Sequence, residues 1–436
     1  MEQQMTRKGY KKTELGEIPE DWLVKPLETF TSFISYGFTN PMPTSSSGPF
    51  MVTARDINSG RVLYESARQT TEEAYKNLLS PKSQPKLKDI LLTKDGTLGR
   101  LALVEKEGIC INQSVALLRP NDRIDPAYLK KLLESPPYQK KMIEDAGGST
   151  IKHIYITIVN RMAVAVPASK LEQTAIAKTL SDVDNLITSL EKLIAKKRDI
   201  KTATMQQLLT GKTRLPGFDK HPDGKPKGMQ KTELGEIPED WNVKSLLELL
   251  KQNPKYGINA AAVPLSGNLP TYIRITDISE DGYFKPSPKM GVDNPFSDEY
   301  QLSEGDILLA RTGASVGKSY LFRTGDGKLV YAGFLIKISP DETFLSPSYL
   351  FHYFKTEPYW QWVTIMSMRS GQPGINSIEY GQQQLPIPPR EEQTSIANAL
   401  SDMDNEIEAI SQRVDKTKQI KQGMMQELLT GRTRLI

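Results

Sequence analysis

Two stretches, one towards the end of each half of the chain, carry apolar residues at a regular spacing. The apolar positions are Val183, Ile187, Leu190 and Ile194 in the first stretch and Met403, Ile407, Ile410 and Val414 in the second. Steps of four, three and four residues are typical of a coiled-coil seam. The pattern predicts two long helices, each with one apolar stripe that must be buried against another element.

The two stretches belong to a duplicated chain. The eleven residues from Lys12 to Trp22 recur letter for letter from Lys231 to Trp241, and the long stretches repeat at nearly the same distance. Two repeats are too few for a solenoid. We therefore predict two similar lobes related by a pseudo-twofold axis.

Local signals predict where the two long helices begin and end. Ser181 and Ser401 carry the side chain of an N-cap residue, and Gly211 and Gly431 lie where a C-terminal glycine is common. Equivalent helices about a pseudo-twofold axis run antiparallel, so we predict an intramolecular coiled coil. The pattern also allows a second arrangement, in which each helix covers its own lobe.

Polar residues occupy later positions of both seams. They are Lys197 and Lys201 in the first helix and Thr417 and Lys421 in the second. Polar seam residues cost stability but fix the register of the helices. We interpret the basic run between Lys192 and Lys201 as a solvated face of the coiled coil rather than as a DNA contact.

Between these helices and the repeated openings, each half alternates short strand-like runs with turns. Asp89–Leu92 leads to a turn at Gly96, and Asp306–Leu309 leads to the equivalent turn at Gly313. The predicted fold class is α+β, with two globular lobes separated by two long antiparallel helices. The predicted divisions are an opening segment at 1–22, a lobe at 23–167, a helical part at 168–215, a linker with the repeated segment at 216–241, a second lobe at 242–389, and a helical part at 390–436.

Composition limits the class of protein. Hydrophobic residues make up 38% of the chain, enough to fill real cores, and the single Cys110 excludes an internal disulfide. No apolar run reaches membrane-spanning length and the first residues are too polar for a secretory signal, so we expect a cytoplasmic protein. Net charge is only +4, so a nucleic-acid role would require locally concentrated basic residues.

Known catalytic motifs are incomplete or absent in the sequence. Gly313–Ser319 has three residues between its glycines where a phosphate loop needs four, and the equivalent Gly96–Arg100 is shorter still, which favours a hairpin turn carrying a basic residue. Asn253–Tyr256 lacks one proline of the Asn-Pro-Pro-Tyr signature of adenine methyltransferases, and no glycine-rich cofactor loop follows a strand. His153, His221 and His352 are isolated in the sequence and form no zinc motif with the single cysteine.

Binding chemistry remains, in loops at matching places of the two lobes. Arginine, lysine and glutamine read base edges or grip phosphates. For each candidate residue, a position in an ordinary solvated loop is about as good an explanation as DNA binding. The candidate DNA-binding residues are Tyr36, Thr39, Lys94, Arg100, Thr150 and Lys152 in the first lobe, and Tyr256, Asn259, Arg311, Lys318, Arg369 and Gln372 in the second.

Three repeated motifs carry a family resemblance. Glu-Leu-Gly-x-Ile-Pro-x-x-Trp opens each half, Glu-Gln-x-x-Ile-Ala starts at Glu172 and Glu392, and Gln-x-Leu-Leu-Thr-Gly-[Lys/Arg]-x-Arg ends at Arg214 and Arg434. With these motifs the chain resembles, over nearly its full length, the specificity subunit of type I restriction-modification systems.

The resemblance implies a non-catalytic subunit with two target-recognition domains, each reading one half of a bipartite, asymmetric double-stranded DNA target. It also implies two modification subunits docked on the repeated regions, and restriction subunits that act as an ATP-dependent translocase and endonuclease. S-adenosylmethionine, ATP and Mg²⁺ would be bound by those partners, and this chain would hold no cofactor or metal. A free-standing DNA methyltransferase and a bivalent protein-binding scaffold are the alternatives, and the missing cofactor loop argues against the first.

Overall fold

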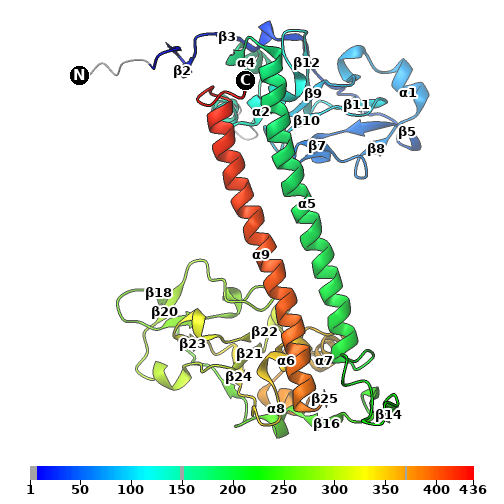
Figure 1. The fold of residues 1–436 in the computed structure, drawn as a ribbon, viewed down its shortest axis with the longest axis vertical. Helices are drawn as coiled ribbons and strands as arrows, with labels where there is room; N and C mark the ends of the chain where they lie inside the picture. The colour runs from blue at the N-terminus through cyan, green and yellow to red at the C-terminus, as the bar shows by residue number, and fades with distance from the viewer. Residues whose placement is uncertain (1–6, 148–151, 369–370) are drawn as a thin grey trace. The chain divides into compact units, whose positions relative to one another are not determined.

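The computed structural model describes residues 7–147, 152–368 and 371–436 (Figure 1). The chain divides into two compact units, one formed by residues 1–191 and 412–436 and the other by residues 192–411. Each unit therefore contains one lobe together with a part of each long helix.

The first unit contains the first lobe. Its strands are β1 (Tyr10–Thr13), β2 (Gly16–Pro19), β3 (Trp22–Pro26), β4 (Thr31–Tyr36), β5 (Ser45–Val52), β6 (Ile57–Asn58), β7 (Arg61–Val62), β8 (Arg68–Gln69), β9 (Ile90–Thr93), β10 (Leu101–Leu103), β11 (Ile109–Ile111), β12 (Val115–Pro120) and β13 (Ala163–Pro167). Its helices are α1 (Glu72–Asn77), α2 (Pro126–Glu134), α3 (Pro136–Glu144), α4 (Ile156–Arg161) and the start of α5 (Lys170–Leu209).

A four-stranded antiparallel sheet in the order β10-β9-β12-β4 divides the first lobe into two cores. Alternate residues of a strand point to opposite faces, so Ile90 and Leu92 enter one core with α2, while Leu91 enters the other. The second sheet has the order β11-β5-β8, with β11 and β5 parallel. Burial on both faces explains why β9 reads as an unbroken apolar run.

The second unit contains the second lobe. Its strands are β14 (Met229–Thr232), β15 (Gly235–Pro238), β16 (Asn242–Ser245), β17 (Lys255–Tyr256), β18 (Ala262–Pro264), β19 (Thr271–Ile273), β20 (Met290–Val292), β21 (Ile307–Ala310), β22 (Ser319–Leu321), β23 (Leu329–Tyr331), β24 (Leu335–Ile338) and β25 (Gln384–Ile387). Its helices are α6 (Pro347–Tyr353), α7 (Glu357–Met366), α8 (Ser377–Gly381) and the start of α9 (Arg390–Leu428).

The two lobes share one sheet register. In the first, Ala116 of β12 pairs with Tyr36 and with Leu92, and in the second, Ile336 of β24 pairs with Tyr256 and with Leu309. The second lobe's order, β17-β24-β21-β22, is thus that of the first lobe. The predicted α+β lobes, and the duplication of their architecture, are confirmed.

The long helices begin earlier than the cap signals predicted. α5 starts at Lys170 and α9 at Arg390, so Ser181 and Ser401 lie inside helices and are not N-caps. Leu180, directly before Ser181, is fully buried, and its equivalent Leu400 is too. Burial of these upstream turns overrides the local preference of Ser-Asp for a helix start. At the other end, Gly211 and Gly431 have φ of 72° and 69°, as predicted for C-terminal glycines.

Both predicted surroundings of the helices occur, in different parts of each helix. In the first unit, Leu180 of α5 and Leu428 of α9 enter the core of the first lobe. In the second unit, Leu400 of α9 and Leu208 of α5 do the same for the second lobe. Each lobe core is therefore closed by the start of its own helix and the end of the other.

Between these ends the helices pair antiparallel within each unit. In the first, Lys421 and Lys418 of α9 reach Asp184 and Glu191 of α5 at 2.7 and 2.8 Å. In the second, Lys197 and Lys201 of α5 bind Glu406 and Asp404 of α9. Three of the four polar seam residues thus form ion pairs that specify the pairing, and the fourth, Thr417, is buried.

The eight apolar seam positions are not equally buried. Ile187, Leu190, Ile407 and Val414 are at most 8% exposed, while Val183, Ile194, Met403 and Ile410 are half-buried. Antiparallel contact along the seam is observed within each unit. Knobs-into-holes packing of a coiled coil stays a prediction.

The repeated motifs meet in a clamp of ion pairs, one in each unit. In the first, the Arg434 guanidinium binds both carboxylate oxygens of Glu172 and, at 2.9 and 3.0 Å, those of Asp21. Glu172 is fully buried, and these bidentate bonds raise the pKa of Arg434 and lower that of Asp21. The closing motif of one half is thus fixed to the opening and helix-start motifs of the other.

The second clamp has the same geometry. Arg214 binds Glu392, which is fully buried, and Asp240 at 2.9 and 3.1 Å. Burial alone would lower the pKa of Arg214, but its bonds to the two carboxylates raise it. Trp241 Nε1 also donates to Glu392 at 3.0 Å, whereas Trp22 Nε1 has no partner among the described residues. The repeated ends of the two halves therefore contact each other within each unit.

No helix within the described ranges is long and apolar enough to cross a membrane.

Candidate functional site

A tyrosine and a basic residue come together at one edge of the sheet in the first lobe. Tyr36 ends β4 and Lys94 follows β9, and these strands flank β12. Lys94 Nζ lies 5.5 Å from the centroid of the Tyr36 ring, and the Tyr36 side chain is 49% exposed. An exposed ring beside a cation suits nucleic acid, since rings stack on bases and cations pair with phosphates or base edges.

The second lobe repeats this pair with arginine in place of lysine. Arg311 Cζ lies 4.7 Å from the centroid of the Tyr256 ring, and Tyr256 is 39% exposed. The Tyr256 hydroxyl accepts a hydrogen bond from the Ser377 amide, and Arg311 Nη1 donates to the Gly333 carbonyl oxygen at 3.4 Å. Four of the predicted binding residues thus form two equivalent pairs.

A glycine fixes the backbone directly after each tyrosine. A Cβ at Gly37 would lie 1.8 Å from the Ile111 carbonyl oxygen, and one at Gly257 would lie 2.2 Å from that of Ala332. The chain must pass this close because Phe38 bridges Asn112 in parallel, as Ile258 bridges Ala332. The repeated Tyr-Gly dipeptide therefore holds the exposed ring on a rigid strand end.

Arg100 and Lys318 occupy equivalent places on the far side of the glycine turns. Arg100 Nη1 donates to the Ile57 carbonyl oxygen at 3.2 Å, while Lys318 Nζ lies 3.5 Å from that of Ile278 and 2.6 Å from a Glu280 oxygen. Each side chain thus contacts a backbone carbonyl oxygen of an isoleucine within its own lobe. This gives them a structural role, and DNA contact by them stays a prediction.

Four of the remaining candidates lie in loops. Thr39, Asn259, Lys152 and Gln372 are exposed. Gln372 also lies near the Gly313 turn, where a Cβ would be 3.1 Å from its Nε2 atom. Thr150 and Arg369 lie outside the described residues.

A histidine that the sequence analysis left isolated joins the first-lobe pair. His153 Nδ1 lies 2.6 Å from Asp95 Oδ1, and Lys94 Nζ lies 2.7 Å from the other oxygen of the same carboxylate. Asp95 and His153 also form a β-bridge. Lys94 and Lys152 directly precede these two residues in the sequence and were the available signal. The pairing itself was hidden because Asp95 and His153 are 58 positions apart.

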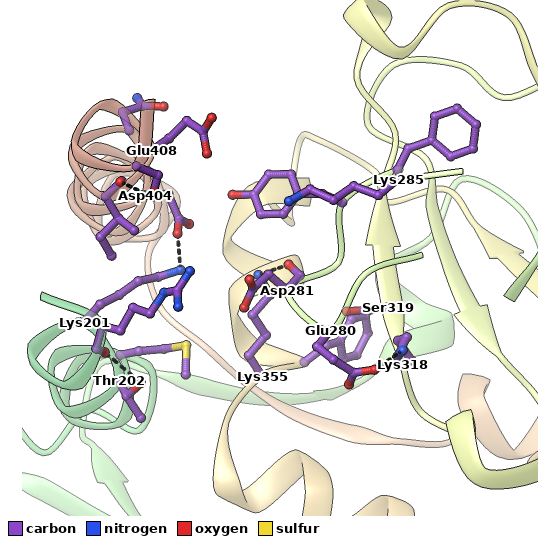
Figure 2. A pocket seen from close by; sticks show the side chains of 18 of the residues that line it. Lys201, Thr202, Glu280, Asp281, Lys285, Lys318, Ser319, Lys355, Asp404 and Glu408 are labelled. Atoms are coloured by element: carbon purple, nitrogen blue, oxygen red, sulfur yellow. Dashed lines mark hydrogen bonds and ion pairs between the residues drawn. The ribbon is translucent and has the colours of Figure 1, made fainter. Parts of the chain in front are cut away.

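A separate cavity of about 800 Å³ lies within the second unit, between the second lobe and the paired helices (Figure 2). In Figure 2, Lys201 points to Asp404 across the two helices, and Lys355 points to the Asp281 backbone, whose carbonyl oxygen accepts its hydrogen bond at 2.8 Å. Burial and the nearby Lys201 lower the pKa of Lys355 to about 7. Both basic and acidic side chains line this cavity, and Tyr256 and Arg311 are not among its lining residues.

Two residue types that often serve catalysis, the cysteine and one histidine, are buried. Burial raises the pKa of the Cys110 thiol to about 12 and lowers the pKa of His352 to about 2. The glycine turns at Gly96 and Gly313 join antiparallel strands, as the hairpin interpretation predicted. Across residues 7–147, 152–368 and 371–436, no three His, Cys, Asp or Glu side chains gather where they could hold a metal ion.

Comparison with known proteins gives one consistent family. The profile of the type I restriction modification DNA specificity domain matches residues 43–200 and 238–421. A putative type I restriction enzyme MjaX specificity subunit of Methanocaldococcus jannaschii is 27% identical, over 98% of this chain and 97% of that protein. The MjaVIII specificity subunit of the same organism is 28% identical, over 80% of this chain and 79% of that protein.

Solved structures agree on the fold. The crystal structure of the type I restriction-modification S subunit from M. genitalium has a TM-score of 0.56 at 17% identity, and the comparison covers 93% of this chain and 96% of that chain. A chain from a structural study of complex assembly and conformational transition in the type I system has the same TM-score and identity, covering 95% and 99%.

Proposed function

The chain belongs to the type I restriction modification DNA specificity family, whose function is recognition of a DNA target, and we propose that each of its two lobes reads one half of a bipartite target. The observation that carries this proposal is the duplicated tyrosine–cation pair. Lys94 with Tyr36 and Arg311 with Tyr256 occupy the same register on equivalent sheets, while the side chains around them differ. Equal scaffolds with unequal side chains suit two different half-sites.

The divisions predicted from the sequence follow this scheme. Residues 23–167 and 242–389 would be the two recognition lobes, and 168–215 and 390–436 the helical parts that set the spacer between the half-sites. The segments at 1–22 and 216–241 would complete the clamps. The ion pairs across the helices support a helical part of fixed length, because they hold each helix in one register.

Type I specificity subunits bind DNA and assemble with modification and restriction subunits. For this chain we infer two modification subunits, docked on the outer faces of the repeated segments and helical parts. The inner residues of the repeated motifs are engaged in the clamps, but each unit also presents the same hairpin, β1–β2 or β14–β15. Two equal surfaces fit two copies of one partner.

The chain itself would catalyse no methyl transfer. S-adenosylmethionine would be held by the modification subunits, and ATP and Mg²⁺ by the restriction subunits. Equilibrium dialysis with S-adenosylmethionine and a methylation assay on the purified chain test this inference. Methyl transfer by the chain alone would overturn it and favour a free-standing methyltransferase.

Duplex footprinting with and without the modification subunits tests the proposed function. We expect two protected segments separated by an unprotected spacer, and loss of protection in a single segment when Arg311 is replaced by alanine. Sequence-independent protection would contradict the proposal. Partner binding without any footprint would favour a protein-binding scaffold.

A further inference from the structure

The Asp95–His153 pair lies where the two lobes have the same backbone and different side chains. Asp95 and His153 form a β-bridge in the first lobe, and Thr312 and Gly374 form the equivalent bridge in the second. The surrounding hydrogen bonds match as well. The amide of Ile154 donates to the Lys94 carbonyl oxygen at 2.9 Å, and that of the residue after Gly374 donates to the Arg311 carbonyl oxygen at 2.9 Å.

Lys94 and Arg311 are both basic, whereas the residues of the neighbouring bridge differ in chemistry between the lobes. The first lobe has an imidazole at the bridge, and the second has glycine. Two lobes that read different half-sites should differ in the side chains that face the DNA. This bridge fits that expectation, because its backbone is the same in both lobes, its side chains differ, and it lies next to a cation and an exposed ring.

Geometry fixes the tautomer of the neutral imidazole. An ionised carboxylate only accepts hydrogen bonds, so the 2.6 Å contact with Asp95 requires His153 Nδ1 to carry a proton and donate it. The Lys94 ammonium, 2.7 Å from the other carboxylate oxygen, already balances the charge of Asp95. A neutral imidazole in this tautomer presents the lone pair of Nε2.

His153 has the exposure that a contact with a ligand requires. Its side chain is 42% exposed, and Nε2 has no hydrogen-bond partner among the described residues. A neutral Nε2 accepts hydrogen bonds. The accessible donors of a duplex major groove are the exocyclic amino groups of adenine (N6) and cytosine (N4).

We propose that His153 is a specificity-determining residue of the first lobe, with Nε2 accepting a hydrogen bond from an exocyclic amino group at one base pair of its half-site. Asp95 is the positioning residue, since it fixes the tautomer and the orientation of the ring. The inference rests on the proposed function, because it assumes that the first lobe reads a half-site.

The test uses the full-length chain with its modification subunits and a duplex library randomised across the target. His153→Ala should remove the preference at one base pair of one half-site, with about a tenfold loss for the favoured base, and leave the other half-site unchanged. Asp95→Asn should weaken the preference at the same base pair. A purely structural role for either residue would lower affinity for all sequences alike.

Base analogues identify the atom that is read. Purine in place of adenine, or 2-pyrimidinone in place of cytosine, removes the amino group alone. At the base pair that depends on His153, the analogue should cost the parent complex about tenfold and cost the His153→Ala complex almost nothing. Equal losses in both complexes would overturn the proposal.

The chain offers a matched control. His221 also pairs with a carboxylate, at 2.8 Å from Glu239, and its side chain is 46% exposed, but it lies in the linker between the halves. His221→Ala should leave every base preference unchanged. If His153→Ala fails to fold, the analogue series on the parent decides, and the absence of an amino-dependent position in the first half-site would overturn the inference.

Failure of the proposed function would look different. In that case the parent complex would select no sequence from the library. Selection of two half-sites by the parent, with an unchanged profile for His153→Ala, would uphold the function and reject the role of His153.

Discussion

The clamp between Arg214 and Glu392 makes a strong prediction about the stability of the second unit. Arg214→Met removes the guanidinium and leaves the fully buried Glu392 carboxylate with its bond from Trp241 Nε1. Breaking a buried ion pair from one side costs about 3–5 kcal/mol, and we expect about 3 kcal/mol because that bond remains. The Arg434→Met change in the first clamp should cost a similar amount, about 3 kcal/mol. Water screens the Arg434 side chain, which is 33% exposed, but the fully buried Glu172 carboxylate keeps no bond from a tryptophan.

Amide hydrogen exchange resolves the two units separately. A loss of about 3 kcal/mol corresponds to exchange roughly 150-fold faster in protected amides near Trp241 and at the start of α9. Amides near Trp22 and at the start of α5 should be unaffected by Arg214→Met and should respond to Arg434→Met.

A double substitution provides the control for Arg214→Met. Arg214→Met combined with Glu392→Gln removes the uncompensated charge and should recover more than half of the loss. An effect below about 1 kcal/mol for Arg214→Met, or equal changes in both units, would refute the view that the repeated motifs act as clamps within each unit.

Three further predictions concern the helix pairing, the recognition edge and the spacer. Burial alone would raise the pKa of Asp184, but its bonds to two lysines lower that pKa. The stabilising effect of the Asp184 carboxylate is therefore present above roughly pH 3.9 and is lost as the pH falls through the lowered pKa. Asp184→Asn should therefore lower the free energy of unfolding of the first unit by about 1–2 kcal/mol at pH 7, and the difference between parent and variant should vanish in acid titrations of denaturant unfolding. Arg311→Ala should cost about 1–3 kcal/mol if it reads a base, with the loss confined to one half-site in a binding selection, and a uniform loss would assign it to phosphate. Inserting four residues after Ile194 and four after Val414 lengthens each helix by about 6 Å and turns it by roughly 40°. One base pair turns the duplex by roughly 34–36° and advances it by about 3.4 Å, so the rotations nearly agree and the lengths differ by less than one base pair. The preferred spacer in a spacer-randomised library should grow by one or two base pairs, and an unchanged optimum in a folded, partner-bound variant would show that the helices do not set the distance.

Features that repeat along the chain were predictable from the sequence. The shared Tyr-Gly dipeptide and the strand before each glycine turn placed Tyr36, Lys94, Tyr256 and Arg311 among the candidates, and the structure brings them together in pairs. The heptad spacing likewise predicted the two long helices, and the duplication predicted that they pair antiparallel. Both features were predictable because the local residue pattern and the duplication specify them.

Features set by distant contacts were not predictable. Ser181 has the sequence of a helix start, yet burial of the preceding turn keeps it within α5. The Arg434–Glu172 ion pair joins residues 262 apart, and a bridge over 58 residues unites Asp95 with His153. No local propensity carries such information, because these pairs exist only after the lobes have folded.

The central claim is that the two lobes read separate half-sites, and exchanging one lobe tests it most directly. Residues 23–165 would be replaced by the corresponding lobe of a relative, with the clamps and helices kept, and the target of the assembled complex selected from a randomised library. We predict that one half-site changes while the other half-site and the spacer stay as in the parent. A change in both half-sites together would contradict independent reading by the two lobes.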